Sequence, residues 1–169
     1  MYARVSPDTI LTQGDLIEGC PLVSFKVGDG PLNLTNPAIA WWPARVVVLT
    51  QACDLAQPKT GVVLVAQVHD AQKLVESGTL KAATIRDQIR RHQVFGWYFL
   101  PGASEPVVVT EALVDLRDVH SVPRAVLEQL IVDGKRVATL QSPYREHLAQ
   151  HFAVTYMRIA LPEPYGTKP

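Results

Sequence analysis

Cysteine is scarce in this chain, which has only Cys20 and Cys53 among its 169 residues. The two do not form a Cys-x-x-Cys pair, so the ligand spacing of structural zinc sites is missing. Secreted domains held together by disulfides usually contain more cysteines than this. We therefore expect free thiols, a cytoplasmic location and no metal or other cofactor.

Long apolar runs and an excess of one charge are missing as well. No segment approaches the ~18 apolar residues of a membrane span, and residues 1–15 contain no apolar run typical of a signal peptide. Sixteen basic and sixteen acidic residues give a net charge of zero. This balance disfavours global coating of nucleic acid, but it is compatible with a local basic patch. From the missing apolar runs we expect no membrane partner.

What is present is a globular composition with several strand patterns. Apolar residues make up 47% of the chain, which predicts one domain, residues 1–169, with a single core. The runs Val46–Leu49 and Val62–Val68 are apolar on both faces, so we expect adjacent, buried antiparallel strands. A long loop is expected over residues 28–43, which are rich in Gly and Pro. The strands predicted in all lie at about 16–25, 45–50, 61–68, 97–100, 107–110 and 112–119.

Helical patterns are confined to three regions. Residues 71–92 lack aromatic residues and contain many helix formers, and Gly78 is expected to divide them. A short helix is predicted after Pro123, and a final helix is predicted over about 143–160, with His147 and His151 flanking its apolar stripe. Strands followed by helices predict a mostly-β, α+β fold.

The order of these segments resembles a known family. Gly14-Asp15 follows a short arm, two apolar runs begin at Arg45 and Val62, and residues 113–122 lead into the helices. Together they resemble the MazF/PemK toxin superfamily, also called CcdB-like. The resemblance implies a small SH3-like barrel with C-terminal helices, in which residues 71–92 are a helical insertion.

The resemblance also implies a chemistry and partners. Toxins of this superfamily cut single-stranded RNA without a metal, are paired with an antitoxin and dimerise through the barrel and last helix. Cleavage needs a proton acceptor and a cation near the phosphate, and by position His69 and Arg45 are the candidates. Both depart from the family pattern, because Arg45 follows Pro43 rather than preceding a proline and His69 replaces a hydroxyl residue.

A basic stretch inside the insertion is a second candidate site. Cationic side chains followed by aromatic rings are typical of single-strand RNA binding, where bases stack on rings and phosphates meet cations. An exposed helix face followed by a buried aromatic strand explains the same pattern, and we favour that explanation. The candidate RNA-binding residues are Lys81, Arg86, Arg90 and Arg91.

The segment Thr50–Leu55, TQACDL, has no counterpart in the family pattern. We interpret Cys53 as a buried residue that packs like a small apolar side chain, and Asp54 as a group that satisfies turn backbone. By composition alone, Cys53 could instead pair with His69 or His120 for hydrolysis, or join Asp54 and a histidine in a metal site.

Two functions follow from these observations. One is a non-catalytic interaction or regulatory module of a bacterial stress or defence system, with an antitoxin or defence protein as its partner. The other is a toxin-type endoribonuclease, which requires Arg45 and His69 to be open to solvent beside a cationic mouth. The departures at both positions favour the first.

Overall fold

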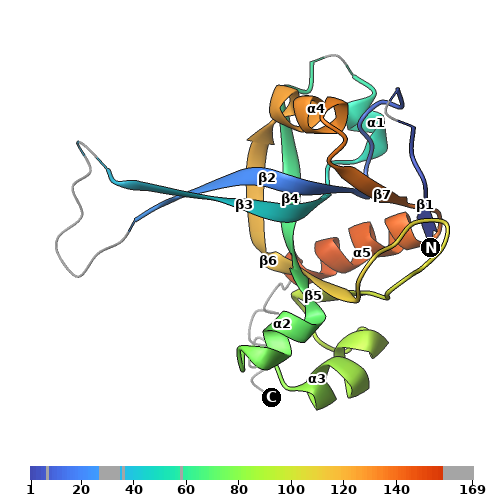
Figure 1. Ribbon diagram of the computed structural model, residues 1–169. Helices are drawn as coiled ribbons and strands as arrows, with labels where there is room; N and C mark the ends of the chain where they lie inside the picture. The colour runs from blue at the N-terminus through green and yellow to red at the C-terminus, as the bar shows by residue number, and fades with distance from the viewer. Residues whose placement is uncertain (7, 27–34, 36, 58, 158–169) are drawn as a thin grey trace, which may run out of the picture.

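Seven antiparallel strands form one sheet in the order β1-β7-β2-β3-β4-β6-β5 (Figure 1). The structure, a computed structural model, describes residues 1–6, 8–26, 35, 37–57 and 59–157. The strands are β1 Tyr2–Ala3, β2 Asp15–Phe25, β3 Ile39–Val48, β4 Val62–Asp70, β5 Trp97–Leu100, β6 Ala112–Pro123 and β7 Arg136–Leu140. The helices are α1 Ala52–Leu55, α2 Ala71–Glu76, α3 Ala82–Asp87, the 3-10 turn η1 Ile89–Arg91, α4 Arg124–Val132 and α5 Tyr144–Tyr156.

The two apolar runs at the centre of the sheet are adjacent, as predicted. β3 and β4 pair antiparallel, with Arg45 opposite Val68 and Val48 opposite Val65. Residues 46–48 and Val65 are fully buried, and only the start of β4, at Val62, is exposed. Both faces of this pair are covered, which explains why neither run alternates between apolar and polar residues.

Helices cover both faces of the sheet. Leu148 of α5 packs into the core on one face, while Leu55 of α1 and Leu127 of α4 pack into the core on the other. A third apolar cluster lies under α2 and α3, where Ile85 and Ile89 are buried. The sheet is open, with β1 and β5 at its ends, and the fold is α+β and mostly β.

Two strand predictions were wrong. Residues 39–43 are the first half of β3 and not part of a loop; residues 28–34 and 36 of the expected loop lie outside the described residues. Pro43 is tolerated in β3 because this part of the strand pairs on one side only, with β2. Residues 107–110 form no strand, and only an isolated bridge joins Ala103 to Val109.

The helical predictions are largely confirmed. Residues 71–92, predicted to be a helical insertion, contain α2, α3 and η1, with the chain turning at Gly78. α4 follows Pro123, and α5 occupies most of the last predicted helix, whose final positions 158–160 lie outside the described residues. Within the part of the chain that the structure describes, every helix is too short or too polar to cross a membrane.

The Gly14-Asp15 pair organises the N-terminal segment. Gly14 has a φ of +84°, and a Cβ there would lie 3.0 Å from Cβ of Leu140, so the close approach of β7 favours glycine. The fully buried Asp15 binds Arg136 with Oδ2 at 3.1 Å, and the Arg136 side chain is only 3% exposed. Nη2 of Arg136 also donates to the carbonyls of Ser6 and Thr9. This buried pair therefore ties Ser6, Thr9 and Asp15 to β7.

Candidate functional site

Arg45 lies opposite an irregularity in β2. The register pairs Ile17 with Val46 and Cys20 with Ala44, so the two residues Glu18 and Gly19 stand opposite Arg45 alone. This is a β-bulge, a device that redirects a side chain, and Gly19 takes the positive φ of +69° that the bulge requires. The bulge brings the Glu18 carboxylate next to the Arg45 guanidinium.

The Arg45 guanidinium already has hydrogen-bond partners within the protein. Its Nε donates to Oε1 of Glu18 at 2.6 Å, and its Nη1 donates to Oγ1 of Thr110 at 3.3 Å. The side chains of Arg45 and Glu18 are 26% and 39% exposed, so the pair sits at the surface of a cleft. The sequence did not indicate Glu18, although the Glu-Gly dipeptide inside a strand is a signal of a bulge.

His69 reaches the same cleft from the other side of β4. It follows Val68, the partner of Arg45, so the alternation of a strand turns the two candidate side chains to opposite faces. The His69 ring meets Trp97 edge-on, with centroids 6.1 Å apart. Arg45 and His69 both line a cleft of about 450 Å³, because β4 runs past its pairing with β3 at this point.

The charges in this cleft are mixed, not cationic. Lys73 adds a second positive side chain, and Glu18 and Asp70 supply two carboxylates. Oδ1 of Asp70 accepts the backbone N–H groups of Gln72 and Lys73 at 2.9 and 3.1 Å, so this carboxylate caps α2. The endoribonuclease hypothesis requires a cationic mouth that binds phosphate. In this cleft, acidic side chains balance the positive ones.

Two of the four candidate RNA-binding residues border a second cleft of about 370 Å³. Arg86 and Arg90 line it together with the carboxylates of Asp70 and Glu111. Arg86 binds Asp87 at 2.9 Å, and the guanidinium of Arg90 lies over the Phe99 ring at 4.8 Å. Neither cleft is lined by the two other members of the predicted set, Lys81 and Arg91, which are exposed.

Most of the aromatic residues after this basic stretch lie in the buried strand β5. Trp97 and Tyr98 are 5% and 1% exposed, so their faces are closed to nucleotide bases. The ring of Trp97 is also covered by Arg117, whose guanidinium lies 4.6 Å from the ring centroid. Trp97 and Tyr98 therefore agree with the favoured explanation, an exposed helix face followed by a buried strand, whereas Phe95 before the strand is 46% exposed. RNA binding by this stretch stays a prediction.

The prediction that Cys53 is buried was wrong. Cys53 is exposed, and its Sγ lies 3.6 Å from Oε1 of Gln51 and 3.8 Å from Oδ1 of Asp54. The single turn of α1 directs Leu55 into the core, and the residue two positions earlier then faces solvent. The buried thiol is that of Cys20, and burial raises its pKa to about 11.

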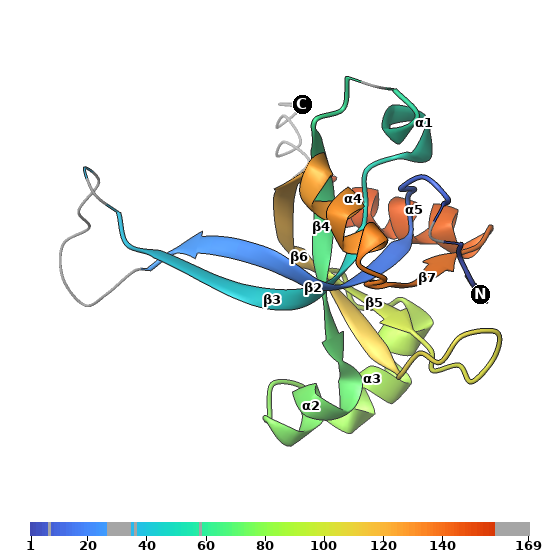
Figure 2. The ribbon, with the colours of Figure 1, turned by 45° about the horizontal axis from the view of Figure 1, so that its top comes forward.

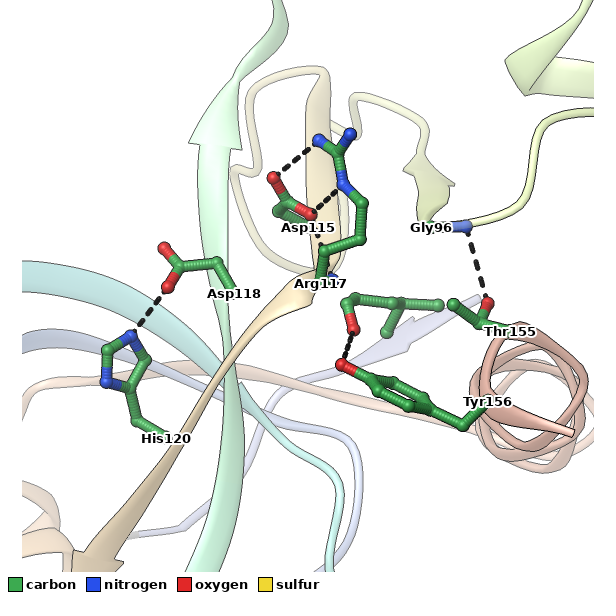
Figure 3. Close-up of polar contacts among 8 residues, drawn as sticks. Gly96, Asp115, Arg117, Asp118, His120, Thr155 and Tyr156 are labelled. Atoms are coloured by element: carbon green, nitrogen blue, oxygen red, sulfur yellow. Dashed lines mark hydrogen bonds and ion pairs between the residues drawn. The ribbon is translucent and has the colours of Figure 1, made fainter. Parts of the chain in front are cut away.

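No hydrolytic pair forms around Cys53. α1 lies near the start of β4 and His69 near its end, so the two residues are at opposite ends of that strand (Figures 1 and 2). His120 instead binds Asp118, with Nε2 2.8 Å from Oδ1, as Figure 3 shows. The His120 ring also meets Trp42 edge-on at 5.9 Å.

Figure 3 also shows how the end of α5 is attached to the sheet. The Tyr156 hydroxyl donates to the Leu116 carbonyl at 2.8 Å, and the Gly96 N–H donates to Thr155 at 3.3 Å. Both contacts join α5 to the neighbourhood of β5 and β6. Tyr156 is 58% exposed in spite of its hydrogen bond, so the predicted apolar stripe is only partly covered.

His92 lies against His147 and His151 of α5, an arrangement of three histidines that the sequence did not reveal. The His92 ring centroid lies 4.5 Å from that of His147 and 5.6 Å from that of His151, beside a cavity of about 220 Å³. His151, predicted to flank the apolar stripe of α5, is 7% exposed. Burial lowers the pKa of His92 and of His151, and the neighbouring imidazoles lower both further.

A ring nitrogen of two of these histidines is unsatisfied. Nδ1 of His92 and Nε2 of His151 are buried without a hydrogen-bond partner. The His147 ring contacts the Tyr98 hydroxyl at 3.4 Å through Nδ1. Across the described residues, no three His, Cys, Asp or Glu side chains are arranged to hold a metal ion.

Comparison with known proteins adds no relative to this description. No protein-family model matches the chain, and a search of curated proteins gives no match. Membership of the MazF/PemK superfamily therefore stays a prediction from the order of sequence segments.

Proposed function

We propose that this domain is a divergent MazF/PemK-like, SH3-like domain that serves as a non-catalytic interaction or regulatory module of a bacterial stress or defence system. The observation that supports the loss of catalysis is the Arg45–Glu18 ion pair. A guanidinium stabilises a developing phosphorane only if its donors face the phosphate. Here they face a carboxylate that belongs to the same cleft.

The position of His69 supports the same proposal. A general base must come within hydrogen-bonding reach of the hydroxyl that it activates. For RNA cleavage, that hydroxyl would lie beside the phosphate contacted by the Arg45 guanidinium. Strand alternation turns the His69 side chain away from that of Arg45. Asp70 lines both clefts, and each cleft contains carboxylates as well as cations. Such mixed charge is complementary to a protein partner whose surface also carries both signs of charge.

A ribonuclease assay tests the proposal. Purified protein is incubated with a single-stranded RNA pool in chelator, and we expect no cleavage from the wild type or from Glu18→Gln. Metal-independent cleavage that disappears in both Arg45→Ala and His69→Ala would overturn it. Arg145→Ala is the matched control, because Arg145 is also paired with a glutamate, Glu146, but lies on α5.

The endoribonuclease is the second candidate, and one observation favours it: Arg45 and His69 line one cleft. For this candidate, RNA binding has to be local and salt-sensitive, because the chain has no net positive charge. Arg86→Glu with Arg90→Glu should then abolish binding at low salt. Lys59→Glu with Lys135→Glu, at two exposed positions elsewhere, is the control with the same charge change.

A further inference from the structure

The ribbon formed by β2 and β3 continues beyond the sheet as a projecting arm, defined here as residues 21–25 and 39–43 (Figures 1 and 2). Its two segments pair with each other from Pro21 opposite Pro43 to Phe25 opposite Ile39. Isolated two-stranded ribbons are at best marginally stable in water. An arm of this kind is therefore a structure that contact with another surface would stabilise.

One face of the arm is apolar and exposed. Val23 pairs with Trp41 and Phe25 with Ile39, so these four side chains share a face. Their exposed fractions are 55% for Val23, 70% for Trp41, 68% for Phe25 and 58% for Ile39. All four side chains are apolar, which favours an apolar partner surface.

The base of the arm is fixed to the body of the domain by its other face. Leu22 is 1% exposed, and Nε1 of Trp42 donates to Oε1 of Gln67 at 3.4 Å. The Trp42 ring also packs against the His120 ring. The apolar face is thus held outward, which lowers the entropy lost when another surface binds it.

The arrangement of large and small side chains on this face fits a copy of itself. Trp41 and Phe25 lie on one diagonal of the four, and the smaller Val23 and Ile39 lie on the other. A two-fold axis in the contact plane, perpendicular to the strands, places Phe25 on Val23 of the second copy. The same axis places Trp41 on Ile39 of the second copy, so every contact joins a large and a smaller side chain.

The area is sufficient for such a contact. Exposed fractions of this size leave roughly 500 Å² of apolar side-chain surface per chain, since large aromatic side chains bury about 150–250 Å² each. Two faces together supply about 1,000 Å², the lower bound for a specific interface. We propose that the arm mediates a homodimer, in which the apolar faces of two arms pack against each other about a two-fold axis. This inference does not depend on the function proposed above.

Sedimentation velocity of the full chain across about 1–200 µM, a range that covers weak interfaces, tests the proposal. We expect a concentration-dependent dimer in the wild type and a dissociation constant at least about tenfold higher in Trp41→Lys and in Phe25→Glu, because central aromatic residues dominate interfaces. Trp41→Phe should retain the dimer. The matched control is Val132→Glu, at a residue of α4 that is 75% exposed, and it should leave the dimer unchanged.

The other outcomes overturn the proposal. A wild type that is monomeric throughout shows that the face does not bind a second copy, and a dimer that survives both arm variants shows that another surface dimerises. Flotation with phosphatidylcholine vesicles completes the test. A monomer whose arm binds these vesicles assigns the face to a lipid surface instead. Circular dichroism of each variant checks that the fold is intact, as exposed positions predict.

Discussion

Strand β2 holds two arginine–carboxylate pairs that have the same chemistry and different settings. Asp15 binds Arg136 on β7, and Glu18 binds Arg45 on β3. The first pair is 0% and 3% exposed, and the second is 39% and 26% exposed. Each member of a buried pair has lost most of its hydration and is stabilised mainly by the opposite charge of its partner. In an exposed pair, water can take the place of either member. The comparison indicates that burial makes the first pair structural and leaves the second free to exchange partners.

The largest effect is expected from Arg136→Ala. This change leaves the Asp15 carboxylate buried without its cation and removes the donors to Ser6 and Thr9. We expect the free energy of unfolding to fall by about 3–5 kcal/mol, the usual effect of removing one member of a buried pair. Urea denaturation measures it. A loss below about 1 kcal/mol would show that the two pairs do not differ.

The three-histidine cluster has a burial between these two extremes and should make stability depend on pH. The groups that face one another there are His92 at the C-terminal end of η1, His147 and His151 from α5, and Tyr98 from β5. His92 and His151 have lowered pKa values in the folded state, so the unfolded chain, with the ordinary value near 6.5, binds protons first. The free energy of unfolding should therefore decrease as the pH falls through about 6.5 and below.

Urea denaturation between about pH 5 and 8, the range in which histidines titrate, measures this slope. His92→Gln and His151→Gln should each flatten it, while His120→Gln, at a histidine that binds Asp118, is the control. An equal slope in the wild type and in the His92 and His151 variants would contradict the prediction.

Glu18→Gln tests the exposed pair. The change should alter the free energy of unfolding by about 1 kcal/mol or less, because Arg45 keeps Thr110 as a partner. It should also strengthen binding of a fluorescent polyanion at low salt, since the cleft loses one negative charge. Fluorescence anisotropy measures this binding, with Glu146→Gln on α5 as the control. Unchanged polyanion binding would show that Arg45 remains unavailable without its carboxylate.

The smallest effect is expected from Cys53→Ser. The side chain is exposed, so the free energy of unfolding should change by no more than about 0.5 kcal/mol, as is usual for surface positions. Native Cys53 should react with iodoacetamide while the buried Cys20 reacts only after unfolding. Mass spectrometry of alkylated native protein distinguishes the two thiols, and slow labelling of Cys53 would contradict its exposure.

The sequence predicted the centre of the sheet better than its periphery. Val46–Leu49 and Val62–Val68 were predictable because strands covered on both faces have a simple apolar pattern. β7 was missed because five residues after the turn at Gly134 carry too little pattern to mark a strand. Residues 39–43 were taken for a loop because of their proline, which a ribbon with free outer edges accommodates.

The candidate site was less predictable because its decisive contacts are long-range. Arg45 and Glu18 are separated by 27 positions and meet through a bulge whose only sequence signal is Gly19. The exposure of Cys53 depends on which way one helical turn faces, and the burial of Leu55 decides that direction. His92 joins His147 and His151 only after the insertion has packed beside α5.

The pairing of the first strands with β7 has a consequence for synthesis of the protein. β1 and the start of β2 find their hydrogen-bond partners in residues 136–140, more than a hundred positions later. The edge of β2 therefore stays open on the ribosome until most of the described chain has been translated. Contacts of such long sequence separation slow folding and leave unpaired edges exposed to aggregation. Translation speed and chaperone access late in synthesis should thus determine how much folded protein a cell obtains.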